Sequence, residues 1–491
     1  MILTGSHSMI KKRVPRLPSP AKINYNLRKI QRSNNEPDCD IVDRISALPD
    51  EILVNIVALL PLDEAQATRI LSRRWRYIFR SVLNATMKLD FDAEKHLSNF
   101  ASREDLAIPS YVVWVDKVLE QYRGSNIKRF RVCYDLDSTF SSSINKWIHF
   151  AMTKGVEMLE LDLLEYGVCR RMEFPIYTFP HEILGIIKES AWKHICSDIP
   201  RLRPCACIGF KSLKVLNFKC VDVDGEVLEY MLSKCPVLER LSLGYSPSLL
   251  SLRVVGPSIA LKYLEIQHCA RLESVEICDT NLVSFVYYGD EINLIVKNVP
   301  LLVEVSICES CHNDYIQVAF TQFSSCLSQL EILKLIDVIL PYKRNSVFPI
   351  FTNLKHLELR FDEDDDCIPL HLSSFIKASP FLHKLVLELY PLTNRREIEF
   401  KQAAKCSHDY LRVVEIFGYH GRTSDCELVK FLTEIAVNLE KMVTDPAHPA
   451  ERHYCFPKHR RKPDIEEVAR IEQSRYDYTT TVRKNFLQLR N

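Results

Sequence analysis

The chain has 491 residues, of which 47% are hydrophobic and 26% are charged, and these values are ordinary for a soluble globular protein. That length is enough for two or more hydrophobic cores or for one extended solenoid. Lys and Arg total 64 against 63 Asp and Glu, so the formal net charge of +1 gives no overall attraction to nucleic acid or to an anionic membrane.

Glycine is scarce, with 12 residues in the whole chain. Phosphate-binding loops need glycine because the backbone must approach the phosphate closely. The sequence contains no GxGxxG, no GxxxxGK[ST] and no GxSxG. No pairing of a nucleophile with a base stands out either, so we expect a chain without catalytic activity.

The beginning of the chain gives no sign of export. Residues 1–30 contain no apolar run of the signal-peptide kind, and no stretch reaches the ~18 apolar residues of a membrane span. We therefore expect an intracellular protein, of the nucleus, the cytoplasm or both, whose 17 cysteines are reduced. Eight basic residues and no acid lie between Lys11 and Arg32, which predicts a solvated, disordered basic tail rather than a nuclear address.

Residues 41–85 carry three short helical patterns in a row. Pro49 suits the first turn of a helix, where its missing N–H is not needed. Pro61 ends this helix, a second follows with Asp63 as its N-cap, and Ser72 opens a third. Three short helices cannot bury this much apolar surface among themselves. The excess predicts either a binding partner or packing against the following domain.

From about residue 125 the pattern LxxLxL recurs. Copies begin at Ile127, Leu213, Leu238, Leu261, Leu272, Leu282, Leu302, Leu330, Leu354, Leu382 and Leu411. Most intervals lie between 20 and 29 residues, which is the period of leucine-rich repeats, each contributing one short strand and a return segment. The short steps around Leu272 predict strands joined by extended connections without a helix. Residues 166–210 give no clean repeat.

Alternation along a strand decides which side chains face the core. In LERLSL, Leu241 and Leu243 point inward, whereas Arg240 and Ser242 point outward. We expect an α/β fold, in which a short helical module precedes a repeat solenoid with a parallel sheet on its concave face. The outward side chains mix acids, bases and aromatics, which suits protein recognition better than phosphate recognition. The candidates for this surface include Arg240, Tyr263, Glu265, Glu276, Tyr288, Glu304, Lys334, His356 and Glu358.

Residues 44–79 resemble an F-box in the form common in plants. LPDEIL, the LLP that follows and LSRRWR stand in the order and spacing of that motif, with Phe79 where plant members often have Trp. Segments such as GEVLEYMLSKCPVLERLSL resemble the plant F-box leucine-rich-repeat family. Residues 411–443 are similar to the FBD motif that ends many of these proteins.

The resemblance implies a role. F-box proteins are substrate receptors of cullin-based ubiquitin ligases: the F-box docks on a SKP-family adaptor, which connects it to the cullin, and the repeats capture a target protein. Such a receptor performs no covalent chemistry and raises the effective concentration of its target near the ubiquitin carrier. By motif position, the residues that would line or support the adaptor interface are Leu48, Pro49, Ile52, Leu53, Ile56, Leu60, Pro61, Leu71 and Trp75.

Two functions therefore compete. The leading one is a substrate receptor for ubiquitination, bound to a SKP-type adaptor and through it to a cullin, with an unknown target protein. The alternative is a leucine-rich-repeat scaffold or ligand sensor without ubiquitin transfer, in which the F-box serves only as a packing module. Co-purification with adaptor and cullin would separate them.

Two short sequence motifs could be mistaken for a haem attachment site or a calcium site. CESCH at 308–312 has the CxxCH form of a c-type haem attachment site, but that chemistry belongs to exported proteins. DEDDD at 362–366 lacks the spaced ligands and the central glycine of a calcium loop. We therefore expect no metal and no cofactor.

The expected organisation has six parts. They are a disordered basic tail over 1–40, the F-box over 41–85, a connecting helical segment over 86–124, leucine-rich repeats over 125–390, an FBD-like segment closing the solenoid over 391–450, and a polar tail over 451–491.

Overall fold

The computed structural model describes most of the chain between residues 43 and 445. The described ranges are 43–92, 104–163, 175–181, 211–309, 320–336, 349–362, 367–390, 407–419 and 421–445. The chain divides into two units, 1–49 and 50–491, and every helix and strand named below belongs to the second. The expectations for the two tails, for most of 166–210 and for most of the acidic run at 362–366 lie outside the described residues.

Three helices open the second unit, as the sequence predicts: α1 (Asp50–Val57), α2 (Leu62–Ala67) and α3 (Arg73–Ala85). Ser72 caps α3, because its Oγ accepts a hydrogen bond from the N–H of Trp75 at 3.3 Å. The predicted N-cap of α2 was wrong. Pro61 precedes α2, and Asp63 lies inside its first turn, where its charge opposes the helix dipole.

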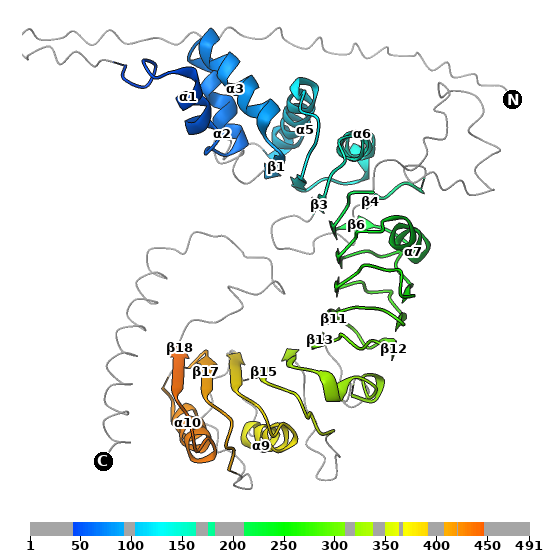
Figure 1. Ribbon diagram of the computed structural model, residues 1–491, viewed down its shortest axis with the longest axis vertical. Helices are drawn as coiled ribbons and strands as arrows, with labels where there is room; N and C mark the ends of the chain where they lie inside the picture. The colour runs from blue at the N-terminus through cyan, green and yellow to red at the C-terminus, as the bar shows by residue number, and fades with distance from the viewer. Residues whose placement is uncertain are drawn as a thin grey trace, which may run out of the picture. The chain divides into compact units, whose positions relative to one another are not determined.

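Thirteen parallel strands of the described chain form one sheet, in the order in which they occur in the sequence. This confirms the α/β fold class, a helical module followed by repeats that share a parallel sheet (Figure 1). The strands are β1 (Lys88–Asp92), β2 (Arg129–Cys133), β3 (Met158–Asp162), β5 (Val215–Lys219), β7 (Arg240–Gly244), β9 (Tyr263–Gln267), β11 (Ser284–Gly289), β13 (Glu304–Glu309), β14 (Ile332–Ile336), β15 (His356–Asp362), β16 (Lys384–Tyr390), β17 (Val413–Phe417) and β18 (Lys441–Asp445).

Helices occupy several of the connections between these strands, and in Figure 1 each lies next to the strands that it joins. They are α5 (Glu104–Gln121), α6 (Ser141–Thr153), α7 (Gly225–Lys234), α9 (Ile368–Ala378) and α10 (Thr423–Ile435). Asp224 caps α7 by accepting the N–H of Val227 at 2.9 Å, and the helix buries Leu228 and Met231. In the described ranges, no helix has both the length and the apolar character of a membrane span.

Burial alternates residue by residue along strands such as β2, β3 and β5, as predicted, whereas β7 and β11 also bury residues of the opposite face. Leu241 and Leu243 of β7 are buried, and so are Phe130 and Val132 of β2. The opposite face of the sheet carries partly exposed side chains such as Arg129 and Arg131. We call this face of the thirteen-stranded sheet the open face.

A second sheet explains the short repeat spacing. It contains three parallel strands, β8 (Ser251–Val255), β10 (Ser274–Cys278) and β12 (Asn293–Lys297), and from β7 to β13 the chain alternates between the two sheets. The prediction of helix-free connections is confirmed, but those connections are themselves strands. Glu276 was therefore wrongly assigned to the open face: it lies on β10, where it pairs with Arg253 of β8 at 2.8 Å.

Two segments contribute strands that extend the main sheet at its ends. The expected helical connector over 86–124 contains α5, but it also contains β1, the first strand of the sheet. At the other end, the FBD-like segment supplies β17 and α10 and leads into β18. This segment thus continues the repeat architecture with two further parallel strands.

Candidate functional site

The helical module leaves an unusual amount of apolar surface uncovered. Helix α1 buries Leu53 and Val57, which lie on its inner face, and exposes Ile52 and Ile56 on the other. Seven of the eighteen exposed large apolar side chains in the described chain lie between Ile52 and Tyr77, so the exposure is concentrated here. We call these seven the helical-module patch: Ile52, Ile56, Leu59, Leu60, Ile70, Leu71 and Tyr77.

Four of the predicted adaptor-binding residues belong to this patch, namely Ile52, Ile56, Leu60 and Leu71. Pro61 is partly exposed at the start of α2. Leu48 and Pro49 fall in the first unit, where Leu48 is partly exposed and Pro49 is exposed. The N–H of Leu48 donates to the carbonyl of Ile45 at 3.0 Å, which forms a turn within that unit.

The other two predicted residues are buried. Leu53 lies in the core, and Trp75 is only 7% exposed. In the free chain these two side chains can support a docking surface from beneath but cannot line it. An ion pair reinforces the same packing, because Arg74 of α3 lies 2.7 Å from Asp50 of α1.

Three of the patch residues were absent from the predicted interface. Leu59 and Ile70 are the most exposed, at 86% and 83%, and Tyr77 is also exposed. Leu59 fits the apolar spacing of the first helix, but α1 ends at Val57 and leaves it in the turn. Ile70 ends a single 3₁₀ turn, whose exposed face a helical periodicity could not have revealed.

The helical module joins the repeats through specific contacts. The indole N–H of Trp114 on α5 donates to the Gln66 side chain of α2 at 2.7 Å. The hydroxyl of Tyr122 donates to the carbonyl of Thr86 at 3.0 Å, between α3 and β1. Because only two residues separate α3 from β1, whatever holds β1 in the sheet also positions α3.

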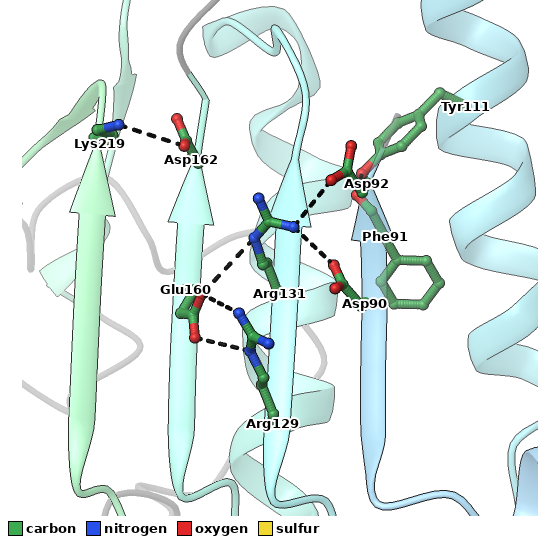
Figure 2. A network of polar contacts seen from close by, with 9 residues as sticks. All are labelled: Asp90, Phe91, Asp92, Tyr111, Arg129, Arg131, Glu160, Asp162 and Lys219. Atoms are coloured by element: carbon green, nitrogen blue, oxygen red, sulfur yellow. Dashed lines mark hydrogen bonds and ion pairs between the residues drawn. The ribbon is translucent and has the colours of Figure 1, made fainter. Parts of the chain in front are cut away.

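Figure 2 shows a network of charged side chains on the open face of β1, β2 and β3. Two nitrogens of Arg129 donate to the two carboxylate oxygens of Glu160, each at 2.9 Å. Arg131 lies 3.1 Å from both Asp90 and Asp92, and 3.8 Å from Glu160. The hydrogen bond to Glu160 raises the pKa of Arg129 above its usual value. This network connects the side chains of three strands, and its two arginines are paired with its three carboxylates.

The centre of the open face is different, because aromatic rings dominate it. Arg240 of β7 lies over the ring of Tyr263 on β9, with 3.6 Å between the guanidinium carbon and the ring centroid. The rings of Tyr245 and His268, which directly follow these two strands, are stacked with centroids 5.1 Å apart. Tyr288 lies on the next strand and is partly exposed. Burial, reinforced by the charge of Glu265, raises the pKa of Tyr263.

Backbone conformation fixes part of this region. Tyr245 and His268 have φ values of 56° and 48°, in the left-handed region that bulky residues seldom adopt. The N–H of Tyr245 donates to the carbonyl of Gln267 at 3.0 Å, a bond that holds the corner after β7. Because the surrounding ladder imposes this geometry, the stacked pair is held in place.

Two serine hydroxyls lie beside this aromatic region. Ser284 of β11 and Ser306 of β13 are buried on the open face, and neither hydroxyl hydrogen-bonds to any part of the chain that the structure describes. A buried polar group without a partner is costly, so these two hydroxyls destabilise this part of the sheet.

The remaining predicted target-binding residues lie toward the C-terminal strands. Glu304 pairs with Lys334 at 3.2 Å on adjacent strands. Burial, together with the charges of Lys384 and Lys334, lowers the pKa of His356. Glu358 is buried rather than exposed, so of the predicted residues it is the least available for contact.

The described residues do not meet the requirements of a metal site. No group of three or more His, Cys, Asp or Glu within those ranges could hold a metal ion. Cys308 of the CESCH motif is buried on β13. Of the other residues of this motif, only Glu309 lies in the described part of the chain. The nine described cysteines are free thiols.

Comparison with known proteins agrees with this architecture. A family model described as "At1g61320/AtMIF1, LRR domain" matches residues 118–475, and one described as "F-box domain" matches residues 45–85. The FBD-associated F-box protein At4g10400 of Arabidopsis thaliana is 27% identical over 410 residues, which cover 81% of this chain and 91% of that protein.

Other relatives from the same plant show a similar combination. The F-box/FBD/LRR-repeat protein At5g22660 is 24% identical over 431 residues, covering 81% of this chain and 89% of that protein. The F-box/LRR-repeat protein At3g59200 is 31% identical over 206 residues, covering 41% of this chain and 36% of that protein. The chain therefore belongs to the plant F-box proteins with a leucine-rich-repeat domain of the At1g61320/AtMIF1 family and an FBD-like region.

Proposed function

We propose that this chain is the substrate-recognition subunit of a ubiquitin ligase of the SKP–cullin–F-box type. Its F-box docks on a SKP-family adaptor, and its repeats bind a target protein. The observation that carries the proposal is the helical-module patch, whose seven exposed apolar side chains lie within the residues that the F-box model matches. Several exposed apolar side chains gathered in one short module are characteristic of a docking site.

The proposed interface combines an exposed layer and a buried support. Ile52, Ile56 and Leu71 offer apolar area to the adaptor, while Leu53 and Trp75 hold the helices beneath them. Apolar anchors that become fully desolvated contribute most of the energy of such an interface. Leu48 and Pro49, placed by motif position, are proposed as further anchors.

The role needs no reactive group in this chain. A receptor of this kind holds its target near the ubiquitin carrier, and the gain in rate comes from effective concentration. The features of the open face are compatible with such a holding surface. The acids and bases of β1 to β3 are paired with one another, and the aromatic centre follows on β7 to β11.

We place the target contact at that aromatic centre. Arg and Tyr are the residue types most often found at energetic hot spots, and here Arg240, Tyr263 and Tyr288 occupy three neighbouring strands of the sheet. The unpaired hydroxyls of Ser284 and Ser306 lie beside them but are buried, so they would support this surface rather than contact the target directly. A target segment lying across the strands would contact Arg240, Tyr263 and Tyr288.

The test is co-purification of the full chain with adaptor and cullin from plant cells. The proposal expects both to be recovered with the wild type and lost when Ile56 is replaced by Asp. Asn55→Asp is the matched control, because it adds the same charge to an exposed position of α1 and removes no apolar area. Recovery of a target without adaptor or cullin would instead favour the scaffold or ligand-sensor alternative.

A further inference from the structure

A cavity of about 310 Å³ lies away from the open face, at the amino ends of β15, β16 and β17. We call it the rim cavity, and it is lined by Thr352, Asn353, Lys355, Phe381, His383 and Tyr410. All six residues belong to the loops that lead into these three strands. The helical-module patch and the aromatic centre of the open face share no residue with the rim cavity.

Three rings surround this cavity. Phe381 and Tyr410 are 46% and 44% exposed, and their ring centroids lie 5.2 Å apart in an edge-to-face arrangement. The ring of His383 is nearly parallel to that of Tyr410, at an angle of 13°. A single exposed aromatic residue is ordinary, but rings that converge on one cavity are typical of a site for an apolar group.

The cavity is held in shape by its backbone. Buried His408 accepts the N–H groups of Tyr410 and Leu411 at Nδ1, at 3.3 and 3.0 Å. Its Nε2 must then carry the proton and donate to the carbonyl of Ser379 at 2.9 Å. The N–H of His383 donates to the carbonyl of Lys355 at 2.9 Å, which joins two of the walls. A site organised in this way loses little entropy on binding.

The charge of the lining is one-sided. None of the six lining residues is acidic, whereas Lys355 and His383 are basic and exposed. Lys355 pairs with Glu331 at 2.8 Å, but both side chains are about half exposed, and such pairs contribute little and can exchange partners. Asn353 already uses its amide to donate to the carbonyl of Ser328 at 2.8 Å. The lining is therefore complementary to an apolar group flanked by carboxylates.

We propose that the rim cavity binds a short acidic segment of a partner protein that presents an aromatic side chain. The aromatic side chain packs against Phe381 and Tyr410, and the neighbouring carboxylates interact with Lys355 and His383. The edge-to-face preference of aromatic rings favours an aromatic anchor over a small one. The inference does not depend on adaptor docking, because its residues and its evidence are separate.

The test measures fluorescence polarisation of labelled pentapeptides against the full-length chain. The probes are EEFEE, EEAEE and KKFKK, which separate the aromatic from the charge contribution. We expect EEFEE to bind saturably and roughly tenfold more tightly than either of the others, a difference of about 1.4 kcal/mol. Phe381→Ala and Lys355→Glu should each weaken EEFEE binding about tenfold or more.

The matched control is Leu301→Ala. Leu301 is an exposed apolar residue three positions ahead of β13, the place that Phe381 holds ahead of β16, but it does not line the cavity. This variant should bind EEFEE like the wild type. Equal affinity for EEFEE and KKFKK, or unchanged binding by a folded Phe381→Ala variant, would overturn the proposal. If Phe381→Ala unfolds, Lys355→Glu decides, because the Lys355 side chain is exposed.

Discussion

Arg240 and Tyr263 are directly opposed on neighbouring strands, with the guanidinium carbon 3.6 Å from the ring centroid. A cation held this close over an aromatic face contributes roughly 0.5–1 kcal/mol at exposed sites. The pair presents a flat, amphipathic platform whose two members restrain each other. This arrangement lowers the entropy that either side chain would lose on contacting a target.

The open face should therefore decide target capture. Reversing the charges of Arg240, Glu265 and Glu304 together should lose the target and keep the adaptor, because none of these residues lies in the helical module. Affinity capture followed by mass spectrometry, with the F-box disabled so that targets are not degraded, measures the loss. The control exchanges the charges of Glu239 and Lys262, an exposed pair 2.9 Å apart just before the strands. Retention of both partners by the triple variant would place the target surface elsewhere.

The repeat core should be intolerant of truncation. Leu241 is buried and lies between Leu216 and Leu264 of the adjacent strands. Leu241→Ala should cost on the order of 2–5 kcal/mol, because each repeat buries its leucines against its neighbours. Denaturant unfolding measures the loss, with the exposed Leu250 replaced by Ala as control. Equal stability of the two variants would contradict the strand register.

The charged network should stabilise the first strands measurably. Arg131→Met removes the cation that lies 3.1 Å from both Asp90 and Asp92, so the two carboxylates lose the ion pair that offsets their mutual repulsion. Because these groups are partly exposed, we expect a loss of about 1 kcal/mol in unfolding free energy. Lys219→Met is the control, since Lys219 meets Asp162 only at 3.7 Å. A smaller loss for Arg131→Met than for the control would show that the network contributes little.

Much of this fold follows from residue patterns. Each of the eleven LxxLxL copies forms a strand that begins two residues after the first apolar position, as in Leu238 and β7. The strand β3 was not predicted, although its motif begins with Val156 and has the same apolar spacing as the eleven copies. The placement of β10 in a second sheet could not be predicted either, since alternation shows that a strand is half buried but not which sheet it joins.

The candidate site was only partly predictable for a similar reason. Motif position identified Ile52 and Ile56, but it also selected Trp75, whose indole packs inward once α1 and α3 meet. The rim cavity was not predicted. Phe381 and His383 lie in the loop before β16 and Tyr410 lies in the loop before β17, and the hydrogen bonds between these neighbouring repeats bring the three rings together.

Stability should depend on pH through two histidines. Burial lowers the pKa of His268, where Lys219 adds to the effect and Asp290 opposes it. Burial likewise lowers the pKa of His356, where Lys384 and Lys334 add to the effect and Glu415 and Glu304 oppose it. Between the pKa of about 6.5 in the unfolded chain and the lower pKa in the folded chain, the unfolded chain binds more protons. Stability is therefore lost as the pH falls from about 6.5 through the folded-state pKa.

The measurement compares urea unfolding of the wild type with that of a His268→Gln and His356→Gln double variant. We expect the wild type to lose more stability between about pH 7.5 and pH 5.5, because glutamine does not titrate. The difference between the two proteins removes the contribution of all other groups. Parallel pH profiles would show that neither imidazole is penalised by folding.

Adaptor docking should be sensitive to the start of the F-box. Leu48 and Pro49 stand at motif positions for apolar anchors, and truncation of a central anchor commonly costs ~2 kcal/mol or more. That is roughly a thirtyfold loss of affinity for one residue, since ~1.4 kcal/mol is tenfold. Replacing both with Ala should therefore abolish co-purification with the adaptor at ordinary concentrations. The repeats have their own core, so target capture should persist and the target should accumulate in cells.

The paired experiment compares the double Ala variant with the wild type by pull-down, with circular dichroism to confirm folding. Trp75→Ala is unsuitable as the test variant, because the buried indole supports the module and its loss would unfold the helices. Leu48 and Pro49 are at least partly exposed, so their truncation should leave the helix content unchanged. A folded variant that still recovers adaptor and cullin at wild-type levels would contradict the receptor mechanism, because docking would then not require the F-box start.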